Sequence, residues 1–196
     1  TAESNVQTFK VRQLPDLTVT NLQVPSTVES GTNFTVSFKV KNSGLGGTFS
    51  AQWNDAVYVS ADATFSGDDK LLLARPNQGQ LAADSSYTQS LLVQLPVGYS
   101  GQYYIFVKAD ADNWITEISE DNNTVRSSAA LTVSLKPLPD ILVKGIQSAT
   151  ANVKPGDSLL INWQVENNGT VPALGGWSER VTLVPASGTE LVLVPN

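Results

Sequence analysis

The chain repeats a series of short motifs in the same order and at nearly the same spacing. Leu14-Pro15-Asp16-Leu17 returns 124 residues later as Leu138-Pro139-Asp140-Ile141. The pairs that follow are Ser30-Gly31 with Pro155-Gly156, Asn42-Ser43-Gly44 with Asn167-Asn168-Gly169, Gly46-Gly47 with Gly175-Gly176, and Trp53 with Trp177. Repetition of this kind predicts tandem copies of one structural unit.

The run inside the first copy has the pattern of a half-buried strand. The pattern alternates apolar Phe34, Val36, Phe38 and Val40 with polar Thr35, Ser37, Lys39 and Lys41. A period of two residues puts the apolar side chains on one face of a sheet and the polar ones on the other. The inner positions of the second copy hold Leu159, Ile161, Trp163 and Val165.

The motifs divide the chain into three parts. Residues 14–136 form one complete copy, and residues 137–196 form the first half of a second copy. We interpret residues 1–13 as the last strand of a preceding copy. Thr8-Phe9-Lys10-Val11 precedes the first Leu-Pro-Asp motif just as Leu131-Thr132-Val133 precedes the second one. A flexible lead-in is the alternative. Between the copies, Leu135-Lys136-Pro137-Leu138-Pro139 predicts a stiff linker, since two prolines restrict the backbone.

Turn residues separate strand-like runs at regular intervals along the complete copy. We expect strands at residues 16–24, 33–41, 53–60, 70–75, 86–95, 101–109 and 124–135. This spacing, with no sustained helical period, is typical of an all-β fold, an immunoglobulin-like antiparallel β-sandwich. Phe38 and Ile105 fall near the positions of the bridging cysteines of antibody domains, so we expect apolar packing to replace the disulfide.

Composition excludes several classes of function. The 196 residues include no Cys and no His, which excludes thiol catalysis, His-based triads and Cys/His zinc sites. The net charge is −6 with only 12 Lys and Arg residues, so no nucleic acid and no membrane surface is expected as a partner. The sequence has no apolar run of about 18 residues or more, and we expect no bilayer-spanning segment.

The order of these motifs resembles the CARDB family, the cell adhesion related domain found in bacteria. The resemblance is carried by residues 14–19, 36–44, 53–62, 110–112 and 117–123. It implies an immunoglobulin-like sandwich, without catalysis, in large extracellular or cell-surface proteins of bacteria or archaea. The second copy departs from the pattern, because it has no counterpart of Asp62, Asp68 and Asp69.

Two groups of acidic residues are candidates for calcium, because Ca²⁺ takes about six to eight oxygen ligands from carboxylates, amides and carbonyls. The first group is Asp62, Asp68 and Asp69, with Asp55 nearby in the sequence. The second lies between the last two expected strands and comprises Asp110, Asp112, Glu117, Glu120 and Asp121, with Asn113 beside them. Neither group matches an EF-hand loop. Solvated turns stabilised by Asp and Asn are the alternative for both groups.

Trp114 is the aromatic residue best suited to ligand binding, because it lies among these acids without an evident packing role. Sugar rings stacked on exposed aromatic side chains would make the chain a carbohydrate- or ligand-binding module of a secreted enzyme. A glycosidase with paired carboxylates is the enzyme class that the composition leaves open, but no pattern places two acids in a cleft.

Together these features predict a non-catalytic, extracellular spacer repeat of a large surface or secreted protein, able to assemble into a rod or filament. The carbohydrate- or ligand-binding module is the alternative. Half a sandwich leaves the apolar face of its sheet uncovered. We therefore expect a neighbouring repeat or an identical chain to complete residues 137–196 by strand addition.

Overall fold

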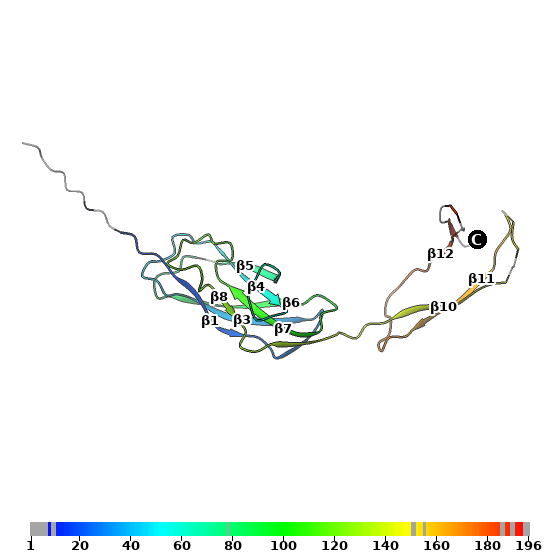
Figure 1. Ribbon diagram of the computed structural model, residues 1–196, viewed down its shortest axis with the longest axis horizontal. Coiled ribbons are helices and arrows are strands. Elements are labelled where there is room, and N and C mark those ends of the chain that lie inside the picture. The colour runs from blue at the N-terminus through cyan, green and yellow to red at the C-terminus, as the bar shows by residue number, and fades with distance from the viewer. Residues whose placement is uncertain are drawn as a thin grey trace, which may run out of the picture. The chain divides into compact units, whose positions relative to one another are not determined.

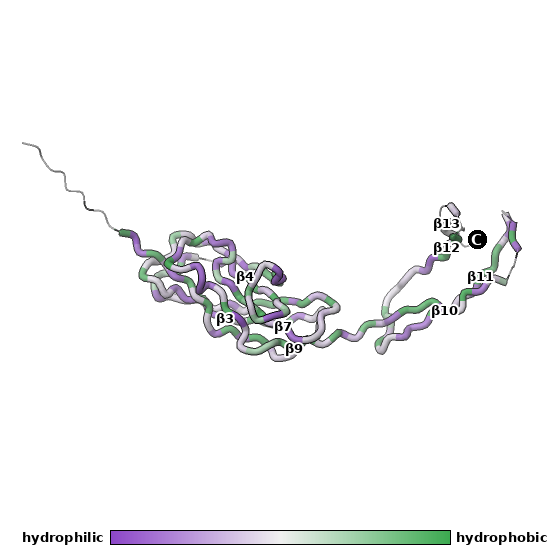
Figure 2. The backbone as a smooth tube through the Cα atoms, in the orientation of Figure 1, coloured by the Kyte–Doolittle hydropathy of each residue, from purple (hydrophilic) through white to green (hydrophobic). Residues whose placement is uncertain are grey.

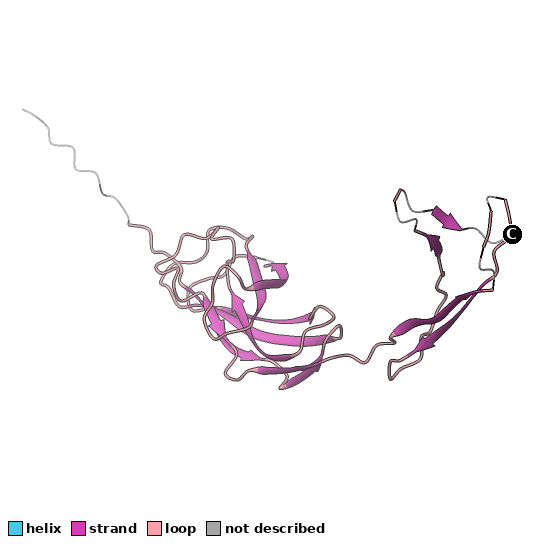
Figure 3. Cartoon of the chain, turned by 45° about the vertical axis from the view of Figure 1, so that its right-hand side comes forward, coloured by secondary structure: helices cyan, strands magenta, loops and turns pink. Residues whose placement is uncertain are grey.

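The computed structural model describes residues 8, 11–77, 79–149, 152–154, 156–184, 187–188 and 191–193. The chain divides into two compact units, residues 1–136 and residues 137–196. Figure 3 shows strands and loops in both units. Among the described residues, no helix has the length and apolar character needed to cross a membrane. Most of residues 1–13, where a strand is predicted, lie outside the described part of the chain.

Two sheets form the first unit (Figure 1). The first sheet has the order β1-β3-β6, with β1 (Leu17–Gln23), β3 (Asn33–Asn42) and β6 (Ser86–Gln94). The second sheet has the order β2-β9-β7-β4-β5, with β8 beside β7. Its strands are β2 (Thr27–Glu29), β4 (Asn54–Ser60), β5 (Lys70–Pro76), β7 (Gly101–Lys108), β8 (Thr124–Arg126) and β9 (Leu131–Ser134). The immunoglobulin-like β-sandwich predicted from the sequence is confirmed.

The core lies between the two sheets. The alternation of apolar and polar residues along β3 decides which face of this strand is buried. The inner side chains of β3 pack in one apolar cluster with Val57, Val59, Ile105, Val107, Leu131 and Val133 of the second sheet. Figure 2 shows apolar residues interleaved with polar ones through this unit. Burial of each such side chain stabilises the fold by roughly 1.5–3 kcal/mol. Phe38 and Ile105 are 1% and 0% exposed, so apolar packing holds the sheets together in a chain without cysteine.

The last strand expected from the sequence is in fact two strands. Residues 124–135 contain β8 and β9, which both pair with β7. Between them the hydroxyl of Ser127 donates to the backbone carbonyl of Ala129 at 2.8 Å. Such local side-chain bonds compete with a strand ladder, and here the chain bends.

The short strand β2 was not expected, and it makes a parallel pair in an otherwise antiparallel sandwich. The chain leaves the first sheet after β1 and passes through Pro25, which has no N–H to donate to a ladder. It then pairs as β2 with β9 of the second sheet, in parallel. The change of sheet therefore comes at the proline.

The second unit contains the antiparallel pair β10 (Ile141–Ser148) and β11 (Ile161–Asn167), and the antiparallel pair β12 (Val181–Leu183) and β13 (Leu191–Leu193). The β10–β11 pair aligns its residues in the same register as the β1–β3 pair of the first unit. Leu17 pairs with Asn42, and Ile141 pairs with Asn167. In both pairs the register shifts four residues into the first strand.

Asn42 and Asn167 fix the start of each pair in the same way. Each Oδ1 accepts hydrogen bonds from the backbone N–H of the Asp before the first strand and of the Gly two residues onward, at 2.9–3.0 Å. The glycine is needed because a Cβ on Gly44 or Gly169 would lie 2.6 or 2.5 Å from a backbone carbonyl oxygen. The motif shared by the two segments therefore forms the same local structure twice.

The inner face of the β10–β11 pair is much more exposed than its counterpart in the first unit. Val143 and Trp163 are 56% and 36% exposed, whereas the equivalent Val19 and Phe38 are 7% and 1% exposed. These two residues and Trp177 line a hollow of about 440 Å³. Within the described residues, no second layer covers this apolar face.

Candidate functional site

The acidic loop, residues 109–123, connects β7 to β8 and is organised around Asp110. This residue has a φ of 45°, in the left-handed region. Its two carboxylate oxygens accept the backbone N–H groups of Trp114 and Ile115 at 2.9 and 2.7 Å. The resulting turn buries Asp110 completely. Burial raises the pKa of Asp110, and the two N–H donors oppose that rise.

Glu117 reaches from this loop to the first strand of the sandwich. Its Oε2 accepts the backbone N–H of Leu17, and its Oε1 accepts the side-chain amide of Asn123 at 2.9 Å. The side chain is buried. The pKa of Glu117 is raised to about 7, mainly by burial and to a smaller extent by the nearby carboxylates of Glu120 and Asp110, while its hydrogen bonds from Leu17 and Asn123 oppose the rise.

Three carboxylates meet in the loop. Oxygen atoms of Asp110, Glu117 and Glu120 all lie within 4.8 Å of one another. Ionised groups so close repel each other unless a positive charge lies between them. The set of donors consists of oxygen alone, which is the preference of a hard divalent cation.

Asn123 lies against this cluster and has an unpaired oxygen. Its Nδ2 donates to Glu117 at 2.9 Å and to Glu120 at 3.4 Å, whereas its Oδ1 has no partner, although the residue is fully buried. A buried carbonyl without a partner costs about 1–3 kcal/mol. Rotation of the amide exchanges its nitrogen and oxygen, so Oδ1 can face the carboxylates when a cation lies among them. The donor set therefore fits a hard divalent cation.

The other two predicted ligands of this loop are exposed. Asp112 accepts the side-chain amide of Asn54 at 2.5 Å, and Asp121 donates its backbone N–H to Ser119 at 3.3 Å. The structure brings Asp110, Glu117 and Glu120 together and leaves Asp112 and Asp121 at the rim of the loop.

The first acidic group stabilises its own turn between β4 and β5. Asp62 accepts the N–H of Thr64 at 2.7 Å, and Asp69 accepts the N–H of Ser66 at 2.8 Å. Asp68 accepts the hydroxyl of Ser66. Within the described part of the chain, these three carboxylates do not form a cluster like that of the acidic loop.

Asp55, which the sequence showed only as a neighbour of the first acidic group, is a buried carboxylate. It accepts the hydroxyl of Tyr87 at 2.5 Å, the amide of Gln89 at 2.9 Å and the N–H of Asp110 at 3.4 Å. Burial raises the pKa of Asp55 to about 6. Because Asp55 lies on β4 and its two side-chain donors lie on β6, these bonds join the two sheets. The two-residue alternation of the strand identifies Asp55 as an inward-facing residue, because it lies two positions after the buried Trp53.

Trp114 is 60% exposed, as its predicted role in ligand binding requires. It borders an open pocket of about 420 Å³ together with Arg12, Leu14 and Phe49. The indole therefore lies on the surface beside the carboxylate cluster, and the backbone N–H of Trp114 attaches it to Asp110 of that cluster.

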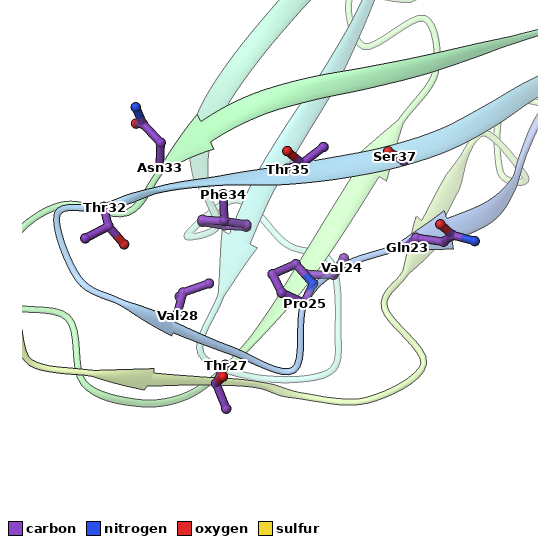
Figure 4. Close-up of a pocket in the computed structure, with 10 residues that line it drawn as sticks. All are labelled: Gln23, Val24, Pro25, Thr27, Val28, Thr32, Asn33, Phe34, Thr35 and Ser37. Carbon is purple, nitrogen blue, oxygen red and sulfur yellow. The ribbon is translucent and has the colours of Figure 1, made fainter.

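A larger hollow of about 600 Å³ lies where β1 leaves the first sheet (Figure 4). Figure 4 shows Phe34, Val28 and Pro25 around it. No lining residue is ionisable: they are Gln23, Val24, Pro25, Thr27, Val28, Thr32, Asn33, Phe34, Thr35 and Ser37. This hollow therefore offers neither a general acid nor a general base.

Comparison with known proteins connects the first unit to one family. The family model CARDB matches residues 14–127, which is more than half of the chain. No curated protein matches the sequence.

Several solved structures resemble the chain. The CARDB domain of a Pyrococcus furiosus protein, crystallised in complex with di-metal ions, is 21% identical with a TM-score of 0.48, over 65% of this chain and 100% of that one. A domain of a protein assigned to the cell surface of Methanosarcina acetivorans is 22% identical with a TM-score of 0.46, over 62% and 93%. A β-glucosidase from Listeria innocua is 15% identical with a TM-score of 0.40, over 62% of this chain and 16% of the enzyme.

Proposed function

Because the chain belongs to the CARDB family, we propose that its complete sandwich is a non-catalytic structural repeat of an extracellular or cell-surface protein. In this role the sandwich holds the parts of a longer chain at a fixed separation. Its function is then a matter of stiffness and length rather than of chemistry, and a rod or filament is the assembly that such repeats would build.

The repeated strand pair carries the proposal. The pairs β1–β3 and β10–β11 have the same register, the same register shift and the same asparagine bonds at their start. We infer that residues 137–196 begin a second copy of the fold in residues 14–136. A linker with two prolines joins these copies, and proline restricts the backbone rotations that a hinge would need.

The buried acids favour a structural role over catalysis. Asp55, Asp110 and Glu117 each accept at least two hydrogen bonds from groups that belong to the fold. A glycosidase needs two carboxyl groups on either side of a substrate cleft. These carboxyl groups lie within the sandwich and its loop, where they hold strands and turns in place.

A second function, calcium binding, is favoured by one observation. The unpaired Oδ1 of buried Asn123 lies in an amide that contacts two of the three clustered carboxylates. We propose that Asp110, Glu117, Glu120 and Asn123 bind a calcium ion. The ion would neutralise the repulsion among the carboxylates and give Oδ1 a partner, so that it would rigidify the acidic loop.

The alternative of a carbohydrate-binding module has less support. Trp53 is fully buried, which leaves Trp114 as the exposed tryptophan of the first unit. Trp114 stays a predicted ligand contact, and the strand addition expected for residues 137–196 stays a prediction as well.

The spacer proposal is tested by small-angle X-ray scattering of the chain and of a Pro137→Gly/Pro139→Gly variant. A stiff linker predicts that the variant scatters as a more flexible particle, with a changed distribution of interatomic distances. Identical scattering from both chains would contradict the role of the prolines, because the linker would then already be flexible.

A further inference from the structure

The acidic loop is bonded to the residues that begin the first strand. Ile118 donates its backbone N–H to the carbonyl of Pro15 at 2.9 Å. Asn122 donates its side-chain amide to Asp16 at 2.9 Å, and Leu17 donates its N–H to Glu117. Three consecutive residues, 15–17, are therefore held by one loop that is about 100 residues away in the sequence.

Glu117 is the residue that connects the two regions. One oxygen of its carboxylate accepts the N–H of Leu17, while the other lies against Asn123 in the acidic cluster. The remaining carboxylates of the cluster, Asp110 and Glu120, make no hydrogen bond to residues 15–17 in the described contacts. Anything that pulls the Glu117 carboxylate toward the cluster or away from it therefore acts on Leu17.

We propose that a divalent cation in the acidic cluster controls how firmly residues 15–17 are attached to the sandwich, through the shared carboxylate of Glu117. This inference rests on the cation site proposed above and adds a regulatory role to it. Leu17 is fully buried and pairs with Asn42 at the first position of β1. Release of Leu17 would therefore free the point at which the preceding chain joins the fold.

The physical reason is linkage between binding and local opening. Without a cation, repulsion among the ionised carboxylates destabilises the closed arrangement relative to conformations in which Glu117 has moved out of the cluster and the Leu17 N–H has lost its acceptor. A cation that binds only the closed conformation shifts the equilibrium toward closure in proportion to its occupancy. The coupling is reciprocal, so attachment of residues 15–17 also strengthens cation binding.

The position of residues 15–17 gives this coupling a mechanical meaning. The equivalent residues of the second unit, Pro139-Asp140-Ile141, begin at the second proline of the linker. The segment that the cation would clamp is thus the one through which a linker enters a copy of the fold. Cation binding would in this way stiffen the junction between a copy and whatever precedes it.

The test follows hydrogen exchange of the Leu17 amide by NMR on the whole chain, as free calcium is raised from an EDTA-treated start. Isothermal titration of the same samples measures calcium affinity independently. We expect saturating calcium to slow exchange of the Leu17 amide by at least about tenfold, whereas exchange of the Phe38 amide in β3 changes little.

Glu120→Gln is the informative variant, because Glu120 belongs to the cluster without contacting residues 15–17. We expect it to weaken calcium binding and to shift the midpoint of Leu17 protection to higher calcium by the same factor. Asp62→Asn, in the other acidic turn, is the matched control and should behave as the parent chain does.

The outcomes separate the two proposals. Absence of calcium binding in the titration would overturn the cation site itself. Calcium binding without slower exchange at Leu17, or a protection midpoint that does not follow the affinity of Glu120→Gln, would overturn the coupling and leave the site standing.

Discussion

Asn123 donates its buried side-chain amide to the carboxylate of Glu117 at 2.9 Å, while its own Oδ1 is left without a partner. The contact with Glu117 holds the acidic loop together, and rotation of the amide would turn its unpaired oxygen toward a cation in the cluster. The same pair thus connects the stability of the loop to its proposed ligand.

Calcium should stabilise the chain against heat. A site with a dissociation constant of ~10 µM at ~1 mM free calcium adds about 2.7 kcal/mol to the free energy of unfolding. For a domain of this size we expect a rise of several degrees in melting temperature, measured by circular dichroism with and without EDTA. The double variant Glu117→Gln/Glu120→Gln should show almost none of this rise.

The matched control for the calcium effect is Asp68→Asn/Asp69→Asn, which changes the same number of carboxylates in the exposed turn after β4. This variant should keep the full calcium response. Equal responses from both double variants would mean that calcium acts elsewhere or without specificity.

Asp55 should make the stability of the sandwich depend on pH. Its pKa is about 6 in the folded chain against an ordinary value of 3.8. Between pH 3.8 and pH 6, Asp55 is therefore protonated in the folded state and ionised in the unfolded state. The contribution of Asp55 to the free energy of unfolding is therefore present in full below pH ~4. It falls by up to ~3 kcal/mol as the pH rises through ~6.

Urea denaturation of the parent chain and of Asp55→Asn at several pH values measures this contribution. The variant keeps an acceptor for Tyr87 but cannot ionise, so the difference between the two chains should change in favour of the variant as the pH rises from 4 to 7. A difference that stays constant over this range would show that Asp55 is ionised throughout.

Phe38 and Trp163 occupy equivalent positions in the two strand pairs, but only Phe38 is covered. Phe38→Ala should lower the free energy of unfolding by ~3–5 kcal/mol, because it removes a large side chain from a packed core. Trp163→Ala should cost much less, since the side chain is 36% exposed. Equal losses in chemical denaturation would indicate that the inner face of the second unit is covered in solution.

Asn42 should be worth more to stability than an exposed asparagine of the same strand. Its amide bonds to the carbonyls of Gly46 and Leu81 at 2.8 and 3.1 Å, in addition to the two N–H groups that it accepts. Asn42→Ala leaves several buried groups unpaired, at about 1–3 kcal/mol for each. In thermal unfolding, Asn33→Ala should stay close to the parent chain, and an equally small effect of Asn42→Ala would contradict this assignment.

The two-residue alternation predicted the sandwich because one physical pattern, apolar inside and polar outside, runs through β3 and its partners. It could not predict β2 or the break between β8 and β9. The position of β2 depends on Pro25, which has no N–H to donate, and the break depends on the hydrogen bond of the Ser127 hydroxyl. Neither feature changes the hydrophobic pattern of the sequence.

The acidic loop shows a similar division. Spacing in the sequence selected Asp110, Glu117 and Glu120, but it selected Asp112 and Asp121 equally, because only the turn around Asp110 decides which carboxylates point inward. Asp55 was noted only because it lies near Asp62, Asp68 and Asp69 in the sequence. The pairing of β4 with β7 instead brings Asp55 to the N–H of Asp110.

The central claim, that the sandwich works as a spacer with a stiff junction, is tested most directly by a distance distribution between the two units. The chain has no cysteine, so spin labels can be placed at Thr35→Cys and Gln164→Cys, on the exposed faces of β3 and β11. Double electron–electron resonance should give one narrow distribution, which broadens when Pro137 and Pro139 are replaced by glycine. A distribution that is already broad in the parent linker, and is unchanged by the glycines, would contradict the claim.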